Sequence, residues 1–78
     1  MAWFEYYWSE KAIDKVAQHG LTQDDFEFAF ENHYREELSP SSDRHVRVGA
    51  TADGRRIAVA FEWVQEDLSV IPVTAYEV

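Results

Sequence analysis

Apolar residues recur at two different spacings along the chain, and the change of spacing separates a helical part from a strand-forming part. From residue 10 to residue 33 they recur every three or four positions, which is typical of helices that bury one face. From residue 45 onward they alternate with polar residues, which is typical of strands with one buried face. The segment AWFEYYW (2–8) precedes both parts and is rich in aromatic residues, so it predicts a short strand.

The first helix is predicted to begin after Ser9, whose hydroxyl can accept a hydrogen bond from a backbone N–H of the first helical turn. Gly20 is predicted to end it, because glycine readily adopts the left-handed conformation found at helix ends. Within the segment EKAIDKVAQH (10–19), one face carries the apolar residues Ile13, Val16 and Ala17.

A second helix is predicted to begin almost at once, after Thr22. Asp25 follows three residues later, which is the spacing of a capping box. The residues that come next at helical spacing predict a buried stripe: Phe26, Ala29, Phe30 and His33. A loop is predicted over residues 38–43 (LSPSSD), which contain a proline and three serines.

The dipeptide Asp53-Gly54 lies between two alternating segments, HVRVGA (45–50) and RRIAVAFEWV (55–64). It is a strong signal for a hairpin with a two-residue turn. That turn places Val46 opposite Phe61 on the face toward the helices, because opposite side chains share a face.

A third strand of the meander is predicted over LSVIPVTAYEV (68–78), after a short turn at residues 65–67. Pro72 lacks the N–H that a sheet interior needs, so it is expected at an edge or a bulge. The whole chain, 1–78, is therefore predicted to be a single α+β domain: a short N-terminal strand, two helices, then a three-stranded antiparallel meander with the helices packed on one sheet face.

The second face of the predicted hairpin combines small residues with long polar ones. Gly49, Ala58 and Ala60 would form its floor. A three-residue turn at 65–67 would add two residues of the last strand to its rim. The complete rim would be His45, Arg47, Arg56, Glu62, Thr74 and Tyr76. This shallow bowl is suited to a phosphate backbone or a partner peptide.

The charge of the chain is unevenly distributed. The chain has 7 Lys and Arg against 15 Asp and Glu, a formal net charge of −8, which disfavours non-specific binding of the whole body to nucleic acid or to a membrane surface. Four of the seven basic residues nevertheless lie within residues 44–56: Arg44, Arg47, Arg55 and Arg56. Two interpretations remain open, since the arginines either keep exposed hairpin strands soluble or form a local basic site.

Several classes of chemistry have no support in the sequence. The chain contains no cysteine, and its three histidines do not have the spacing of metal ligands, so neither a metal nor a cofactor is expected. The apolar segment at the start of the sequence is too short to span a bilayer and has no basic flank, so it does not look like a signal peptide. We therefore expect a soluble, cytoplasmic protein, and a homodimer would compensate for the small size of the domain.

The order of several short motifs resembles the BrnT-type toxins of type II toxin–antitoxin systems, relatives of the RelE-like ribonucleases. The resemblance covers about residues 4–77. It is carried by Trp8, Lys11, His19-Gly20, Asp43-Arg44, Gly49, Gly54-Arg55 and the segment VTAY (73–76). It implies a β-α-α-β-β-β fold, inhibition by a cognate antitoxin protein, and metal-independent cleavage of messenger RNA, in which the RNA 2′-hydroxyl attacks the adjacent phosphate.

By matching position, the resemblance assigns phosphate binding to Lys11, Arg44 and Arg55. The resemblance and the predicted second face together give the expected catalytic set, which is Lys11, Arg44, His45, Arg47 and Glu62. Proton transfer is assigned to His45 or Glu62. The expected substrate-binding set is Arg55, Arg56, Thr74 and Tyr76.

The chain departs from the pattern of the family in two respects. Tyr76 stands where an arginine is usual, although a tyrosine could stack on a base or donate a proton. The negative net charge is opposite to that of most RelE-like toxins. These departures leave two alternatives open, namely a non-catalytic protein-interaction module of the same fold and a structural domain without a specific site.

Overall fold

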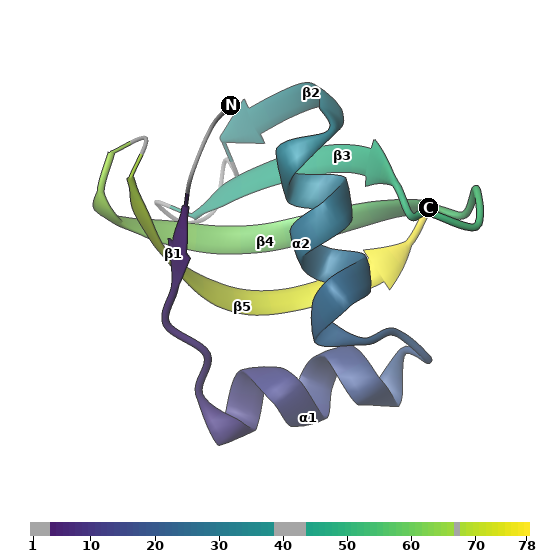
Figure 1. Cartoon of the computed structure of the whole chain (residues 1–78), viewed down its shortest axis with the longest axis horizontal. Helices are drawn as coiled ribbons and strands as arrows, with labels where there is room; N and C mark the ends of the chain where they lie inside the picture. Colours follow the sequence, from purple (N-terminus) through teal and green to yellow (C-terminus); the bar gives the residue numbers. More distant parts are fainter. Residues whose placement is uncertain (1–3, 39–43, 67) are drawn as a thin grey trace.

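A computed structural model of the protein describes residues 4–38, 44–66 and 68–78, which form two helices and a five-stranded mixed sheet (Figure 1). The elements in chain order are β1 (Glu5–Tyr6), α1 (Glu10–Gln18), α2 (Gln23–Glu31), β2 (His33–Leu38), β3 (His45–Ala50), β4 (Arg56–Gln65) and β5 (Ser69–Glu77). The strand order in the sheet is β1-β5-β4-β3-β2. The predicted α+β class is confirmed, whereas the predicted strand count was one too low.

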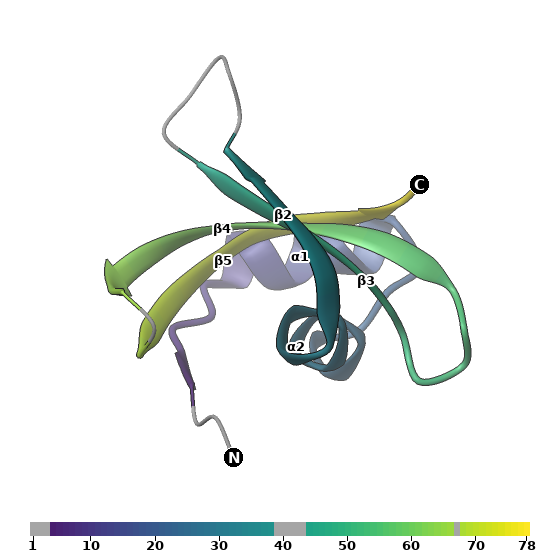
Figure 2. The same ribbon diagram turned by 90° about the horizontal axis from the view of Figure 1, so that it is seen from above.

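Both helices lie on one side of the sheet (Figure 2). α2 packs across β3 and β4, and α1 lies along β5. β1 pairs with β5 in the parallel direction, with Glu5 opposite Ser69, and every other strand pair is antiparallel. Of the loop predicted over residues 38–43, Leu38 instead ends β2, and residues 39–43, which include Asp43, lie outside the described residues, as does residue 67 of the predicted last turn.

The predicted helix starts are confirmed. The Ser9 hydroxyl accepts a hydrogen bond from the Ala12 N–H at 3.1 Å. Thr22 and Asp25 form both hydrogen bonds of a capping box, at 3.1 and 3.0 Å. Gly20 has a φ of +72° after the end of α1. The predicted apolar face of α1 is partly wrong: Val16 is buried as expected, but Ala12 is buried in place of Ala17, which is exposed.

The second helix ends before His33, which corrects the predicted helical stripe. At the end of the helix, the Asn32 side chain and the Asn32 backbone N–H both donate to the Phe28 carbonyl, at 2.9 and 3.0 Å. The side-chain hydrogen bond gives this last carbonyl a second donor. His33 instead begins β2 and pairs with Gly49 of β3, and a bulge follows between His33 and Arg35. β2 is the strand that the sequence pattern missed.

The hairpin between β3 and β4 has a three-residue loop instead of the predicted two-residue turn. The Thr51 N–H donates to the Arg55 carbonyl at 2.8 Å, and the Gly54 N–H donates to the Thr51 carbonyl at 3.0 Å. Gly54 has a φ of +89°, as expected for the left-handed residue that closes such a loop. The longer loop shifts the register by one residue, so His45 lies opposite Phe61 and Arg47 opposite Val59.

A one-residue shift turns every side chain of β3 to the other face of the sheet. His45, Arg47 and Gly49 therefore lie on the helix-covered face, and Val46 and Val48 lie on the opposite face, which corrects the prediction. Gly49 suits its place under α2, because a Cβ atom there would lie 2.5 Å from the Ala29 carbonyl oxygen.

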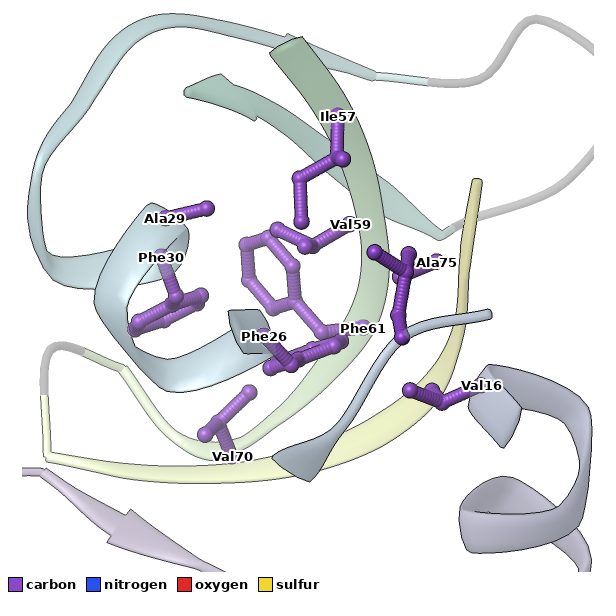
Figure 3. Close-up of a cluster of buried hydrophobic side chains, with 10 residues drawn as sticks. Val16, Phe26, Ala29, Phe30, Ile57, Val59, Phe61, Val70 and Ala75 are labelled. Carbon is purple, nitrogen blue, oxygen red and sulfur yellow. The ribbon is translucent and has the colours of Figure 1, made fainter. Parts of the chain in front are cut away.

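The hydrophobic core lies between the helices and the sheet (Figure 3). Phe30 is fully buried at its centre and makes edge-to-face contact with Phe61, with 4.8 Å between ring centroids. The largest fully buried side chains are Val16, Phe26, Phe30, Ile57, Val59, Phe61, Val70 and Pro72. Aromatic rings thus supply much of the buried area that a domain of this size needs.

The pairing of β4 with β5 contains a bulge, as expected from Pro72. Ala60 lies opposite Thr74, but the next residue, Phe61, lies opposite Pro72, which leaves Val73 as the extra residue. The bulge turns Pro72 into the core and moves Ile71 to the face without helices, where it lies opposite Glu62.

Candidate functional site

The sheet face that carries no helix, called the open face below, holds four of the nine predicted site residues: Arg56, Glu62, Thr74 and Tyr76. Its floor consists of the buried Val48, Ala58 and Ala60. Alternation along the strands places longer side chains around this floor. They are Arg35 and Glu37 from β2, Arg56 and Glu62 from β4, and Ile71, Thr74 and Tyr76 from β5. The residues predicted for the bowl thus share this face only in part, because Val48 takes the place of Gly49 and because His45 and Arg47 lie on the other face.

A hollow of about 170 Å³ lies where the first turns of α1 meet the bulge of β5. Lys11 and Lys15 are four residues apart on α1 and so lie on the same side of the helix. Arg44, which immediately precedes β3, contributes a third cationic side chain. The lining residues of this basic hollow are Ser9, Lys11, Ala12, Lys15, Arg44, Ile71, Pro72 and Val73.

The basic hollow is suited to an anionic group. Three of the seven Lys and Arg residues of the chain line it, and none of its lining residues is acidic. About 10–15 Å³ of such space is enough for one water molecule, so the hollow can hold a group the size of phosphate. The N-terminal end of α1 adds a partial positive charge at the same place.

Glu62 lies at the border of the basic hollow. It is exposed on the open face, and its cross-strand partner is Ile71, which lines the hollow. Lys11 and Arg44, which are far apart in the sequence, therefore line one hollow with Ile71, and Glu62 lies opposite Ile71 on the neighbouring strand. Lys15 was missed by the sequence analysis, although its four-residue spacing from Lys11 could have indicated it.

Arg47 does not belong to this site. Only 7% of the residue is exposed, and its guanidinium lies 4.2 Å from the centroid of the Phe30 ring. It donates to Glu36 Oε1 at 2.5 Å and to the Phe30 carbonyl at 3.2 Å. The same group also lies within 6 Å of the rings of Phe4, Phe61 and Trp63. Arg47 thus connects β3 to β2 and α2 inside the covered side of the sheet.

His45 is also turned away from the predicted site. Its ring stacks on Phe61 of the core, with 5.6 Å between centroids and an angle of 22° between the planes. Glu62 follows Phe61 in β4 and therefore points to the opposite face. The two predicted proton-transfer residues consequently lie on different faces of the sheet.

Arg55 lies at the hairpin loop and has local acidic partners. It donates to Asp53 at 3.1 Å, to Asp25 of α2 at 3.2 Å and to the Gly20 carbonyl at 3.2 Å. The hydrogen bond from the Thr51 hydroxyl is the main cause that lowers the pKa of Asp53, and the hydrogen bond from Arg55 lowers it further. The hydrogen bond to Asp53 also raises the pKa of Arg55. Arg55 therefore attaches the hairpin to the turn between the helices and would have to break these contacts to bind a substrate.

Tyr76 lies toward the other end of the open face from the basic hollow. It is 39% exposed, lies opposite Ala58, and its ring centroid is 6.3 Å from that of His19 at the end of α1. It lies five positions after Ile71, which corresponds to about 16 Å along an extended strand. Thr74 lies between them on the same face. A ligand that reaches from the hollow to Tyr76 would therefore follow β5.

Two further classes of site were sought in the part of the chain that the structure describes. Residues 4–38, 44–66 and 68–78 contain no group of three or more His, Asp or Glu side chains arranged to hold a metal ion. Neither of the two described helices is long and apolar enough to cross a membrane.

Comparison of the chain with models of known protein families gives no match, and comparison with characterised proteins gives none either.

Proposed function

We propose that this protein is a toxin-like, metal-independent endoribonuclease that binds single-stranded RNA across its open face. One observation carries the proposal. Lys11 and Arg44, to which the resemblance assigns phosphate binding, come from distant parts of the sequence and line the same hollow. A shared surface for two such residues is what a phosphate site requires, since two converging cations stabilise one anionic group.

The proposed chemistry is transfer of the phosphoryl group within the RNA chain. The RNA 2′-oxygen attacks the adjacent phosphorus and forms a 2′,3′-cyclic phosphate, while the bond to the 5′-oxygen of the next nucleotide breaks. Lys11 and Arg44 stabilise the charge that develops on the phosphoryl oxygens. Glu62 accepts the 2′-hydroxyl proton, and the departing 5′-oxygen takes a proton from water. Tyr76 stacks on a base farther along the strand.

The acidic body of the protein shapes how RNA would bind. A net charge of −8 repels a polyanion at long range, so attraction is confined to the surface near the basic hollow. Binding should therefore be weak and strongly dependent on salt. A cognate antitoxin would inhibit the protein by filling the same hollow with carboxylates.

Cleavage of a short RNA, compared with the same RNA carrying a single 2′-deoxy nucleotide, tests the proposal. We expect wild-type protein to cut only at nucleotides that retain the 2′-hydroxyl, because that group is the nucleophile. Glu62→Gln should lower the rate by about 100-fold or more, as expected for loss of a general base. Lys11→Ala and Arg44→Ala should each lower it by a similar factor.

Arg35→Ala is the matched control, because Arg35 is an exposed cation on β2, which lies at the far edge of the sheet from β5 and the basic hollow, along which the RNA is proposed to run. It should retain the wild-type rate. If wild-type protein cleaves no RNA and does not arrest growth when it is expressed in a host, the proposed activity is wrong.

A second candidate function is a non-catalytic protein-interaction module. It is favoured by the position of His45, which stacks on Phe61 on the covered face. Of the two predicted proton-transfer residues, Glu62 alone therefore lies on the open face. In that case the basic hollow would bind carboxylates of a partner protein. High salt would then weaken the protein complex, and mutation of Lys11 or Arg44 would have no effect on any RNA.

A further inference from the structure

β2 forms one edge of the sheet. Among residues 4–38, 44–66 and 68–78, its only sheet neighbour is β3, so the backbone groups on its outer side are available to another strand. Such an edge readily accepts an additional strand unless it is protected. The question is therefore which strand would fit the side chains of β2.

The charges on β2 alternate in a way that fits a second copy of the same strand. Arg35 and Glu37 point to the open face, with side chains 60% and 56% exposed, and their Nε and Oε1 atoms lie 3.3 Å apart. Glu36 points to the other face, where Arg47 neutralises it at 2.5 Å. The open-face side of β2 thus carries one positive and one negative charge, separated by two residues.

We propose that β2 pairs antiparallel with β2 of a second copy, about a two-fold axis that passes through Glu36. In this register Arg35 lies opposite the partner's Glu37, and Glu37 lies opposite the partner's Arg35. The four charges alternate in sign around the axis. Opposite charges across a strand pair stabilise it, and like charges destabilise it.

Neighbouring registers lack this complementarity. If the two-fold axis is normal to the sheet, the helices of both copies lie on the same side of the joined sheet. The register can then change only in steps of two residues, because a shift by one residue would turn the side chains of one strand to the other face. One such step places Arg35 opposite the partner's Arg35, and a step in the other direction places Glu37 opposite the partner's Glu37. The two Glu36 side chains do face each other in the proposed register, but each is already paired with Arg47.

The interface is small, because it consists of one pair of six-residue strands. The dimer is therefore weak and dependent on concentration. Tyr34, which is 59% exposed, adds apolar surface close to the paired strands. The interface lies at the far edge of the sheet from β5, along which the basic hollow lies, so dimerisation and RNA binding are separable.

Exchange of the two charges provides the test. Sedimentation velocity over a range of concentrations should show dimerisation of the wild-type chain, and R35E and E37R should each weaken it by about tenfold or more, because each places like charges opposite each other. The double variant R35E/E37R restores opposite charges and should dimerise like the wild type. An equimolar mixture of R35E and E37R should form a heterodimer, because one chain then carries two acidic residues where the other carries two basic ones.

Far-UV circular dichroism of each variant shows whether the variant is folded. The proposal is wrong if the wild-type chain stays monomeric at the highest concentration that remains in solution. It is also wrong if folded R35E or E37R dimerises as well as the wild type, or if the mixture forms no heterodimer. Either of these two results for the variants would mean that the charges of β2 only protect the sheet edge against addition of another strand.

Discussion

Replacement of Arg47 by alanine should destabilise the fold without acting on the proposed RNA site. The substitution removes a desolvated guanidinium stacked on Phe30, an interaction of about 2 kcal/mol. It also removes a charged hydrogen bond to the Phe30 carbonyl, worth about 1.5–3 kcal/mol. Because such contributions are not additive, we expect a loss of about 3 kcal/mol in the free energy of unfolding. A domain of this length is typically stable by about 4–12 kcal/mol, so the loss is large.

Two further substitutions separate packing from charge. Arg47→Met keeps an apolar stem among the rings, and Glu36, whose side chain is 37% exposed, can be hydrated when its partner is lost. Because Arg47→Met loses the same two interactions but leaves a smaller cavity, we expect it to cost about 2 kcal/mol, less than Arg47→Ala. Glu36→Gln leaves the buried cation without a carboxylate and should cost about 2 kcal/mol.

Urea denaturation, followed by tryptophan fluorescence at pH 7, measures these differences. Arg56→Ala is the control, because Arg56 is exposed on the open face and its removal should change stability by less than about 0.5 kcal/mol. The assignment of Arg47 to the core would be refuted if Arg47→Ala were as stable as Arg56→Ala. Loss of RNA cleavage by a fully stable Arg47→Ala variant would instead return Arg47 to the functional site.

Three other substitutions test separate parts of the structure. Gly49→Ala should cost at least about 1–3 kcal/mol, because its Cβ atom would lie 2.5 Å from the Ala29 carbonyl oxygen; unchanged stability in urea would contradict this packing. Burial is the main cause that raises the pKa of Tyr6, and the hydrogen bond to Glu31 at 2.8 Å adds to it. The unfolded chain therefore loses the phenol proton first, and stability should fall as the pH rises above about 10. Tyr6→Phe should show a smaller fall in thermal melts. Asp53 has a lowered pKa, so its contribution to stability is present above about pH 4 and is lost as the pH falls further. Asp53→Asn should therefore lose less stability than the wild type on acidification. An equal loss of stability would contradict the hydrogen bonds of the loop.

The features of the fold that depend on local chemistry could be predicted from the sequence. Ser9 and Thr22 indicated the helix starts because capping uses neighbouring residues. β2 was missed because its six residues follow α2 almost directly and are held in place by pairing with β3, which is a tertiary contact. A single extra loop residue before Gly54 shifted the hairpin register, and this alone moved Arg47 from the open face into the core.

The candidate site was only partly predictable for the same reason. Lys11 and Arg44 were identified by resemblance, but the hollow that joins them depends on α1 lying beside the bulge at Val73. The choice between His45 and Glu62 depended on the register, and the structure leaves Glu62 at the open face.

Binding of a fluorescent RNA oligonucleotide with 2′-O-methyl groups, which cannot be cleaved, tests the proposed RNA site most directly. Fluorescence anisotropy should show that Lys11→Ala/Arg44→Ala weakens binding at least about tenfold. The same variant should reduce the salt slope of log Kd by about 0.7, since the two cations share one phosphate and each neutralised phosphate of a single strand contributes about 0.7. Arg35→Ala should bind like the wild type. Equal affinity and equal salt slope for the wild type and the double variant, or no binding by the wild type, would contradict an RNA-phosphate site in the basic hollow.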